Sequence, residues 1–302
     1  MVDKAHKFLD PDVLNKITRL DLKARHIVEG FVAGMHKSPY HGFSVEFAKH
    51  REYTAGDDIK HLDWKVFGRS DRLYIKEYEL ETNLRSHILL DTSESMDYKS
   101  GQSSKLELAC YIAASMAYLI LKQQDSVGMV CFDKEVKHFV PSSSSMGHMR
   151  PILGTLAQSA AQNKTDLGAV LNLMAERFRA RGLIILISDL FDKPETILKG
   201  LQHFAHRRHD VIVFHVLDEY ELTFPFERMT LFEGLEEYPK LLVDPRALRK
   251  AYLEEVEKFC EQIRKGCVKQ TIDYVQISTE KVLDVELTKY LASRLAIRGK
   301  LS

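Results

Sequence analysis

A short polar segment after an apolar run carries side chains that could hold a divalent cation. The apolar run ends at Leu90, Asp91 follows it, and Ser93 and Ser95 come at alternate positions. Such a run is typical of a buried strand, and open α/β sheets bind ligands at the carboxyl ends of their strands. Carboxylate and hydroxyl oxygens are hard donors, which favours Mg²⁺ or Mn²⁺ over zinc or copper. Taken alone, the segment fits equally well a helix N-cap, in which a serine satisfies free backbone N–H groups.

Two later segments add oxygen donors of the same kind. Thr165 lies in a polar loop just before a helical pattern, and a second apolar run, from Leu183 to Ile187, is followed by Ser188 and Asp189. The carboxyl ends of parallel strands meet at one edge of a sheet, so these groups are expected to lie near Asp91. The chain therefore offers the ordered set Asp-x-Ser-x-Ser, Thr, Asp.

That order resembles the metal-ion-dependent adhesion site of von Willebrand factor type A domains, over roughly residues 84–295. The resemblance implies a six-coordinate Mg²⁺ or Mn²⁺ site with hydroxyl contacts from Ser93, Ser95 and Thr165. Asp91 and Asp189 would bind the cation directly or through water. Leu190 departs from the pattern, because many type A domains have glycine at this position.

The order of the predicted elements favours an α/β fold with a doubly wound, mostly parallel sheet of the Rossmann type. Strands are expected at 86–91, 127–132, 136–140, 183–189, 211–217 and 271–278, with helices at about 106–122, 147–160, 167–180, 195–208, 244–265 and 282–295. The short turn at Asp133 and Lys134 predicts one antiparallel edge strand. Residues 224–243 look irregular, with room for short strands. Residues 83–302 are assigned to this von Willebrand factor A-like domain.

Residues 1–82 form the second expected part, a small β-containing segment rich in glycine and aromatic residues. Asp10 and Pro11 predict the start of a helix, since they supply a cap and a first-turn proline. An alternating pattern predicts a strand over 73–81. Trp64 is the chain's single tryptophan, and we expect it to anchor this segment to the main core.

Composition limits the function classes. Lys and Arg together number 43, as do Asp and Glu, so the net charge is zero and no nucleic-acid partner is expected. Four scattered cysteines indicate a reducing compartment. The N-terminus lacks the apolar core of a signal peptide. The longest weakly polar run is shorter than the roughly 20 residues of a spanning helix. These features predict a cytoplasmic protein without a transmembrane segment.

An ordered set of motifs resembles a bacterial family known only as domain of unknown function 58. The motifs are Gly34 to Gly42, Glu46-Phe47, Arg51 to Tyr53, Gly56 to Asp58, Asp63-Trp64, Lys76 to Glu79 and Asp91 to Met96. Family members commonly accompany MoxR-type AAA+ ATPases. The resemblance implies an adaptor or chaperone, with such an ATPase or its client as the partner, in complex assembly or metal insertion. Many relatives carry N-terminal membrane helices, which this chain lacks.

Two functions stay open at this point. The favoured one is a metal-dependent binding module without catalysis, in which a partner's Asp or Glu contacts the cation. The alternative is a Mg²⁺-dependent hydrolase of phosphate esters, with Asp91 as nucleophile or metal ligand. A hydrolase needs a positioned base and a cationic stabiliser beside the metal. Glu94 is the nearest candidate base, and no accompanying Lys or Arg pattern is evident in the sequence.

Overall fold

The structure is a computed structural model that describes residue 22 and residues 45–54, 62–70, 72–80, 84–232 and 241–298. The chain divides into two compact units, residues 35–84 in one and residues 1–34 with 85–302 in the other. The helix expected to begin at Asp10 lies outside the described residues. We describe each unit by itself.

The smaller unit contains an antiparallel pair of strands, β1 (Val45–Glu52) and β2 (Tyr74–Leu80), with the short helix α3 (Trp64–Ser70) between them in sequence. The register shifts between Phe47 and Lys49, as at a β-bulge. Within this unit, Trp64 is 61% exposed. Its ring meets Phe67 edge-on at 6.2 Å. The expected anchoring of Trp64 to the main core concerns the other unit and stays a prediction.

The larger unit is built on one six-stranded sheet with the order β10-β7-β6-β3-β4-β5. Its strands are β3 (Arg85–Asp91), β4 (Ser126–Phe132), β5 (Val136–Ser143), β6 (Leu183–Ser188), β7 (Asp210–Leu217) and β10 (Asp273–Ser278). All neighbours pair in parallel except β5, which is antiparallel to β4. The predicted doubly wound sheet, with one antiparallel edge strand, is confirmed.

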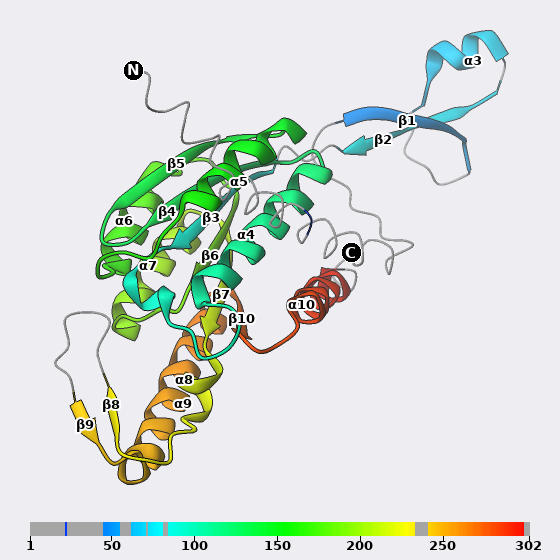
Figure 1. Cartoon of the computed structure of the whole chain (residues 1–302). Helices are drawn as coiled ribbons and strands as arrows, with labels where there is room; N and C mark the ends of the chain where they lie inside the picture. Colours follow the sequence, from blue (N-terminus) through cyan, green and yellow to red (C-terminus); the bar gives the residue numbers. More distant parts are fainter. Residues whose placement is uncertain are drawn as a thin grey trace, which may run out of the picture. The chain divides into compact units, whose positions relative to one another are not determined.

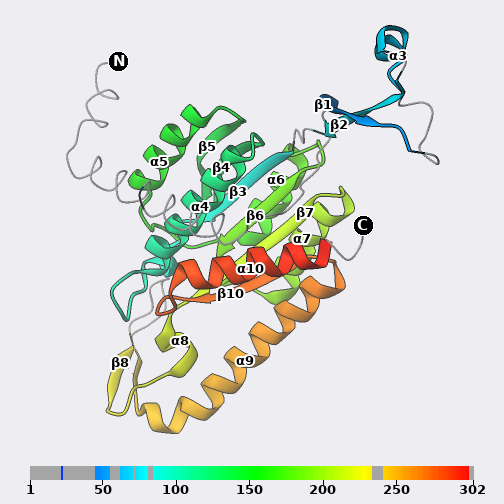
Figure 2. The same cartoon turned by 90° about the vertical axis from the view of Figure 1, so that its right-hand side faces the viewer.

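Helices cover both faces of this sheet (Figures 1 and 2). One face carries α4 (Lys105–Lys122), α5 (Met149–Gln158) and α10 (Leu283–Arg298), with α4 packed on both of the others. The opposite face carries α6 (Leu167–Arg177), α7 (Pro194–His206) and α9 (Pro245–Lys269), with α7 between the other two. Because helices cover both faces, the central strands read as continuous apolar runs.

Residues 224–243 carry short strands, as expected, whereas one strand of the main sheet is longer than expected. Strand β5 continues through Pro141 to Ser143, beyond its predicted end at residue 140. Proline is tolerated there because β5 is an edge strand, so a missing N–H removes no bond from the ladder. The irregular region after β7 contains the short helix α8 (Glu219–Thr223) and a two-stranded pair, β8 (Thr230–Phe232) and β9 (Leu241–Val243).

A histidine ring on β3 of the larger unit is held in its neutral form. His87 on β3 stacks on Phe178, with ring centroids 3.7 Å apart. Burial, followed by the nearby His209 and Arg85 charges, lowers the pKa of His87 to about 4. The folded state therefore resists protonation of this ring at pH values where the unfolded chain accepts a proton.

We predict that His87 makes the fold acid-sensitive. Because its folded pKa is depressed, its contribution is present above the unfolded pKa of about 6.5 and is lost as pH falls toward 4. Urea unfolding should show a loss of about 2 kcal/mol from this group between pH 7 and pH 4.5. His87→Phe keeps a ring on Phe178 and cannot titrate, so its stability should fall less over that interval. Equal pH dependence in both proteins would contradict the assignment.

Candidate functional site

The predicted donor set lies where the direction of the sheet connections reverses. Strands β3 and β6 are neighbours at this switch point, and Leu90 is in register with Ile187. Asp91 ends β3, and Asp189 directly follows β6. The two aspartates therefore stand at adjacent strand ends, on the edge where open α/β sheets bind ligands.

Asp91 is fully buried, yet its oxygens are hydrogen-bonded. The Ser93 N–H donates to Asp91 Oδ1 at 2.9 Å, and Ser188 Oγ donates to Asp91 Oδ2 at 2.6 Å. Burial and then the charge of Asp189 raise the pKa of Asp91 to about 7, against the pull of these donors. Two buried carboxylates thus stand close enough that ionising the second one costs free energy.

The two serines of the loop after β3 point toward the same place. Ser93 Oγ and Ser95 Oγ are 3.2 Å apart, and both residues are buried. The Ser95 side chain also lies near enough to Asp189 to help lower the pKa of that carboxyl. Ser93 occupies the cap position of the short 3₁₀ helix from Glu94 to Asp97 without a side-chain capping bond. The cap interpretation therefore does not account for the Ser93 hydroxyl.

The Thr165 loop is fastened beside the Asp91 loop by two backbone hydrogen bonds. Gln162 N–H donates to Thr92 O at 3.0 Å, and Glu94 N–H donates to Asn163 O at 2.8 Å. Asn163 takes a positive φ of 58°, a conformation that asparagine tolerates better than most residues. The buried Thr165 Oγ1 has no hydrogen-bond partner within the described part of the chain. Such orphaned buried groups are uncommon, and an absent ion is one explanation for them.

Lys105, the first residue of α4, is a site residue that the sequence analysis missed. Its side chain is 2% exposed, and Nζ donates to Asp189 Oδ2 at 2.8 Å and to Glu221 Oε1 at 2.7 Å. Burial opposes ionisation of Asp189, but the Lys105 ammonium outweighs it and holds the pKa of Asp189 below its usual value. Although burial acts in the opposite direction, the two carboxylates raise the pKa of Lys105. A cation at a helix N-terminus is unfavourable by itself. The position of Lys105 at the start of a predicted helix is therefore the feature of the sequence that could have indicated a buried acidic partner.

Glu221 connects this ion pair to helix α8. Its Oε2 accepts the Asp218 N–H at 2.7 Å, which completes a capping box with Asp218, while Oε1 accepts from Lys105. Asp218 follows β7 and is fully buried. Its Oδ2 accepts from Ser100 N–H at 3.1 Å and from Thr279 Oγ1 at 3.0 Å. Asp218 therefore ties together three loops at the same sheet edge.

Two features of these residues suit a divalent cation. Their side chains offer oxygen donors, and the buried Thr165 Oγ1 has no hydrogen-bond partner in the described part of the chain. Across the described ranges, no three histidine, cysteine or carboxylate side chains converge on one point. A cation here would therefore rely on hydroxyl ligands, as the sequence predicts. Side-chain contacts join Asp91, Ser93, Ser95 and Asp189 in one cluster, and the backbone bonds above place the Thr165 loop beside it. The metal assignment itself stays a prediction, and Lys105 already neutralises one of the carboxylates.

Leu190 explains why glycine is common at this position of the pattern. Its φ is 55°, in the left-handed region that glycine adopts without cost. Its N–H donates to Ser188 Oγ at 2.9 Å, the same hydroxyl that donates to Asp91. The leucine side chain is fully buried in the core beneath α6 and α7. The loop thus keeps the conformation that orients Ser188 despite the departure.

Comparison with known proteins gives the family. The family model described as "Protein of unknown function DUF58" matches residues 49–261. The chain belongs to this family. The uncharacterised protein Rv1480 of Mycobacterium tuberculosis is 26% identical over 219 residues, which are 72% of this chain and 68% of that protein. YeaD of Bacillus subtilis is 29% identical over 133 residues, and that match spans 44% of this chain and 31% of YeaD.

Solved structures with a similar fold include von Willebrand factor A domains. BatB from Bacteroides thetaiotaomicron is 19% identical with a TM-score of 0.46, and the match covers 70% of this chain and 98% of BatB. The SpRpn10 VWA domain is 10% identical with a TM-score of 0.39, covering 68% of this chain and 93% of that domain. At these identities the likeness concerns the fold alone.

The prediction of a cytoplasmic location is wrong. One similar structure, from Bacteroides fragilis, is titled an aerotolerance-related membrane protein, and another, from Vibrio fischeri, is titled a membrane spanning protein. In the parts of this DUF58 protein that the structure describes, no helix combines the length and apolar character needed to cross a bilayer. Scattered cysteines and the lack of a signal-peptide core or a spanning run in the sequence do not determine a compartment.

We predict that Lys105 is required for the stability of this site. Lys105→Met leaves Asp189 and Glu221 without their buried partner, a change that typically costs about 3–5 kcal/mol. Lys122→Met, at the exposed far end of the same helix, should cost less than about 1 kcal/mol. Urea unfolding at pH 7.5 measures both. Adding Asp189→Asn to Lys105→Met should recover part of the loss, and equal costs for the two lysines would refute this role.

We also predict that Asp91→Asn stabilises the metal-free protein more at pH 8 than at pH 5. The folded pKa of Asp91 is raised, so the folded state binds more protons than the unfolded chain between pH 4 and 7. Its stability therefore falls as pH rises through that range, and asparagine removes this penalty. The new amide can still accept from Ser93 N–H and donate to Ser188 Oγ. Thermal unfolding in EDTA is the measurement, and a variant that is less stable at pH 8 would show that the charge is favourable.

Proposed function

We propose that this protein is a metal-dependent binding module, with Mg²⁺ or Mn²⁺ held by Asp91, Ser93, Ser95, Thr165 and Asp189. The observation that supports the proposal is the buried, unpartnered Thr165 Oγ1 in a loop fastened beside two buried carboxylates. In a site without an ion, a threonine hydroxyl would be expected to satisfy itself with a nearby acceptor. A cation supplies the missing partner.

The donor set suits attachment of a partner better than chemistry. Hydroxyl ligands carry no formal charge, so a divalent cation bound by two carboxylates stays electrophilic at its open position. A carboxylate from a partner protein can then form a charge-assisted contact there. Ser93, Ser95 and Thr165 position the cation, and Asp91 and Asp189 balance its charge. No proton needs to move at any of these atoms.

Lys105 would make cation binding modest in the absence of a partner. Its ammonium occupies Asp189 Oδ2, so a divalent ion must share this carboxylate or displace the lysine toward Glu221. Displacement is feasible because Glu221 already accepts from the same nitrogen. A partner carboxylate would add the charge that Lys105 removes, so the site would bind the cation more tightly when the partner is present.

We further propose that the partner is a MoxR-type AAA+ ATPase or its client, and that the protein acts as an adaptor or chaperone in complex assembly or metal insertion. This step rests on the family resemblance set out above. We propose no enzymatic activity. The phosphate-ester hydrolase alternative needs a cation free to stabilise the transition state. Lys105 is the buried cation at this edge, and two carboxylates already occupy it.

Titration calorimetry with MgCl₂ tests the proposal. The wild-type protein should bind one ion, and Asp91→Ala should bind none, with circular dichroism unchanged. Wild-type thermal stability should rise with MgCl₂, because the ion binds the folded state preferentially. Equal Mg²⁺ binding by both proteins would sink the metal assignment.

The partner step has its own measurement. A purified MoxR-type ATPase from the same organism should co-purify with the wild-type protein, and both EDTA and Ser93→Ala should weaken the complex. Ser143→Ala, on an edge strand at the other side of the sheet, is the matched control and should have no effect. Undiminished co-purification with an Asp91→Ala, Ser93→Ala double variant would place the docking face elsewhere.

A further inference from the structure

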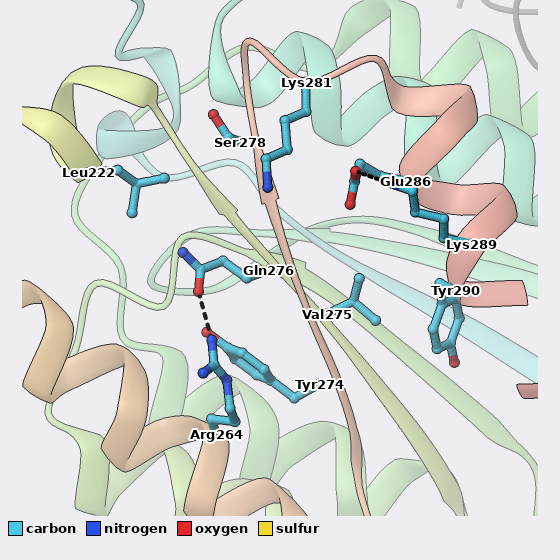
Figure 3. A pocket seen from close by; sticks show the side chains of 10 residues that line it. All are labelled: Leu222, Arg264, Tyr274, Val275, Gln276, Ser278, Lys281, Glu286, Lys289 and Tyr290. Carbon is cyan, nitrogen blue, oxygen red and sulfur yellow. Dashed lines mark hydrogen bonds and ion pairs between the residues drawn. The ribbon is translucent and has the colours of Figure 1, made fainter. Parts of the chain in front are cut away.

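A pocket of about 570 Å³ lies along β10, at the edge of the sheet away from β5 (Figure 3). Tyr274, Gln276 and Arg264 line it on the side of α9, as Figure 3 shows. Val275, together with Lys289 and Tyr290 of α10, lines the other side. The pocket therefore opens along the strand, between the helix layers that cover the two faces of the sheet.

The register of β10 shows which backbone groups face this pocket. Thr279 N–H donates to Leu217 O on β7, and parallel strands alternate the direction of their backbone groups. Residues 273, 275 and 277 therefore bond to β7, while the N–H and C=O groups of Tyr274, Gln276 and Ser278 point away from it. Apart from Ser278 O, which accepts Lys281 N–H, these outward groups have no backbone partner among the described residues.

Charge in the pocket favours an anionic occupant. Three cations and one carboxylate line it, namely Arg264, Lys281, Lys289 and Glu286. Arg264 contacts Gln276 Oε1 at 3.3 Å and Lys289 contacts Glu286 at 3.0 Å. The exposed Lys281 ammonium has no partner in the described ranges, and Figure 3 shows its side chain running along β10. The lining residues carry an excess of two positive charges. Arg264 also pairs with Glu261, outside the lining, at 3.4 Å, so Lys281 is the cation that stays unpaired in the described ranges.

We propose that β10 accepts an extended acidic segment of a partner protein as a seventh strand. Open strand edges bind peptides through main-chain hydrogen bonds, and side-chain pockets supply the specificity. Successive side chains of an added strand alternate between the two faces. One face of the added strand would lie beside Arg264, and the other face would lie beside Lys281 and Lys289. Acidic side chains on either face of the peptide would therefore lie near a cation. The six residues of β10 match a peptide segment of similar length.

Fluorescence anisotropy tests this proposal with a labelled eight-residue peptide that alternates glutamate and threonine. The assay contains EDTA, so its outcome does not depend on the proposed cation site. The peptide should bind, and two changed peptides should not: one with lysine in place of glutamate, and one N-methylated at every residue, so that neither of its edges can donate. N-methylation keeps the charge but removes the N–H groups that a strand must donate.

Variants of the protein separate backbone pairing from charge. Gln276→Pro removes an N–H that faces away from β7, which edge strands tolerate, and it should weaken peptide binding at least about tenfold. Lys281→Gln should weaken binding by about fivefold, as expected for the loss of one partly exposed ion pair. Lys265→Gln, on α9 outside the pocket, is the matched charge control and should leave binding unchanged. Thermal melts check that each variant is folded.

Three results would overturn the proposal. The first is equal binding of the normal and N-methylated peptides, which would show that the pocket gathers anions without adding a strand. The second is self-association of the wild-type protein in sedimentation that Gln276→Pro abolishes, since the occupant would then be a second copy of this chain. The third is the absence of peptide binding. The absence of peptide binding is the result expected if the lysines near this open edge serve only to prevent aggregation.

Discussion

The larger unit depends on one electrostatic constraint, the burial of Asp91 and Asp189 at neighbouring strand ends. Neither carboxylate reaches bulk water, so each must be neutralised, hydrogen-bonded or paired. Asp91 accepts two hydrogen bonds and has a raised pKa, whereas Asp189 takes the ammonium of Lys105. Because Lys105 is the first residue of α4, its ion pair with Asp189 holds the start of that helix at the sheet edge. Through Glu221, the same ammonium also fixes α8 against the edge of the sheet.

At Leu190 an unfavourable backbone conformation required by the site is combined with a favourable burial of the side chain in the core. A non-glycine residue in the left-handed region costs roughly 1–2 kcal/mol. Burying a leucine side chain contributes about 1.5–3 kcal/mol, and Leu190 is fully buried in the main core. The burial offsets the backbone cost, so a leucine is tolerated here. The left-handed turn is retained because Ser188 Oγ must receive the Leu190 N–H while it donates to Asp91.

The apolar runs that end in Asp91 and Asp189 are enough to predict both the sheet and the edge on which the candidate site lies. That prediction succeeds because a strand covered on both faces leaves a continuous apolar pattern. Lys105 could not be found in this way, since its partners lie 84 and 116 residues away in sequence. For Trp64, composition suggests burial of a large ring but does not identify what would cover it, and within its own unit the residue is exposed. Pro141 suggests a strand end, although an edge strand accommodates it.

The candidate cation site and the β10 pocket are connected through the hydrogen bonds of one buried histidine, His215. His215 Nε2 lies 2.9 Å from Asp189 O, and its Nδ1 lies 2.6 Å from the Tyr274 hydroxyl. A carbonyl oxygen only accepts, so Nε2 carries the proton and the hydroxyl donates to Nδ1. Burial lowers the pKa of His215 to about 4, which keeps this neutral tautomer in place. Both ring nitrogens of His215 are hydrogen-bonded in this single arrangement. Transmission of a change from one site to the other would require an element with two alternative arrangements. The candidate cation site and the β10 pocket are therefore two separate binding surfaces on the same sheet. A partner that reaches both gains affinity from the high effective concentration of its second contact rather than from a change in the protein's shape.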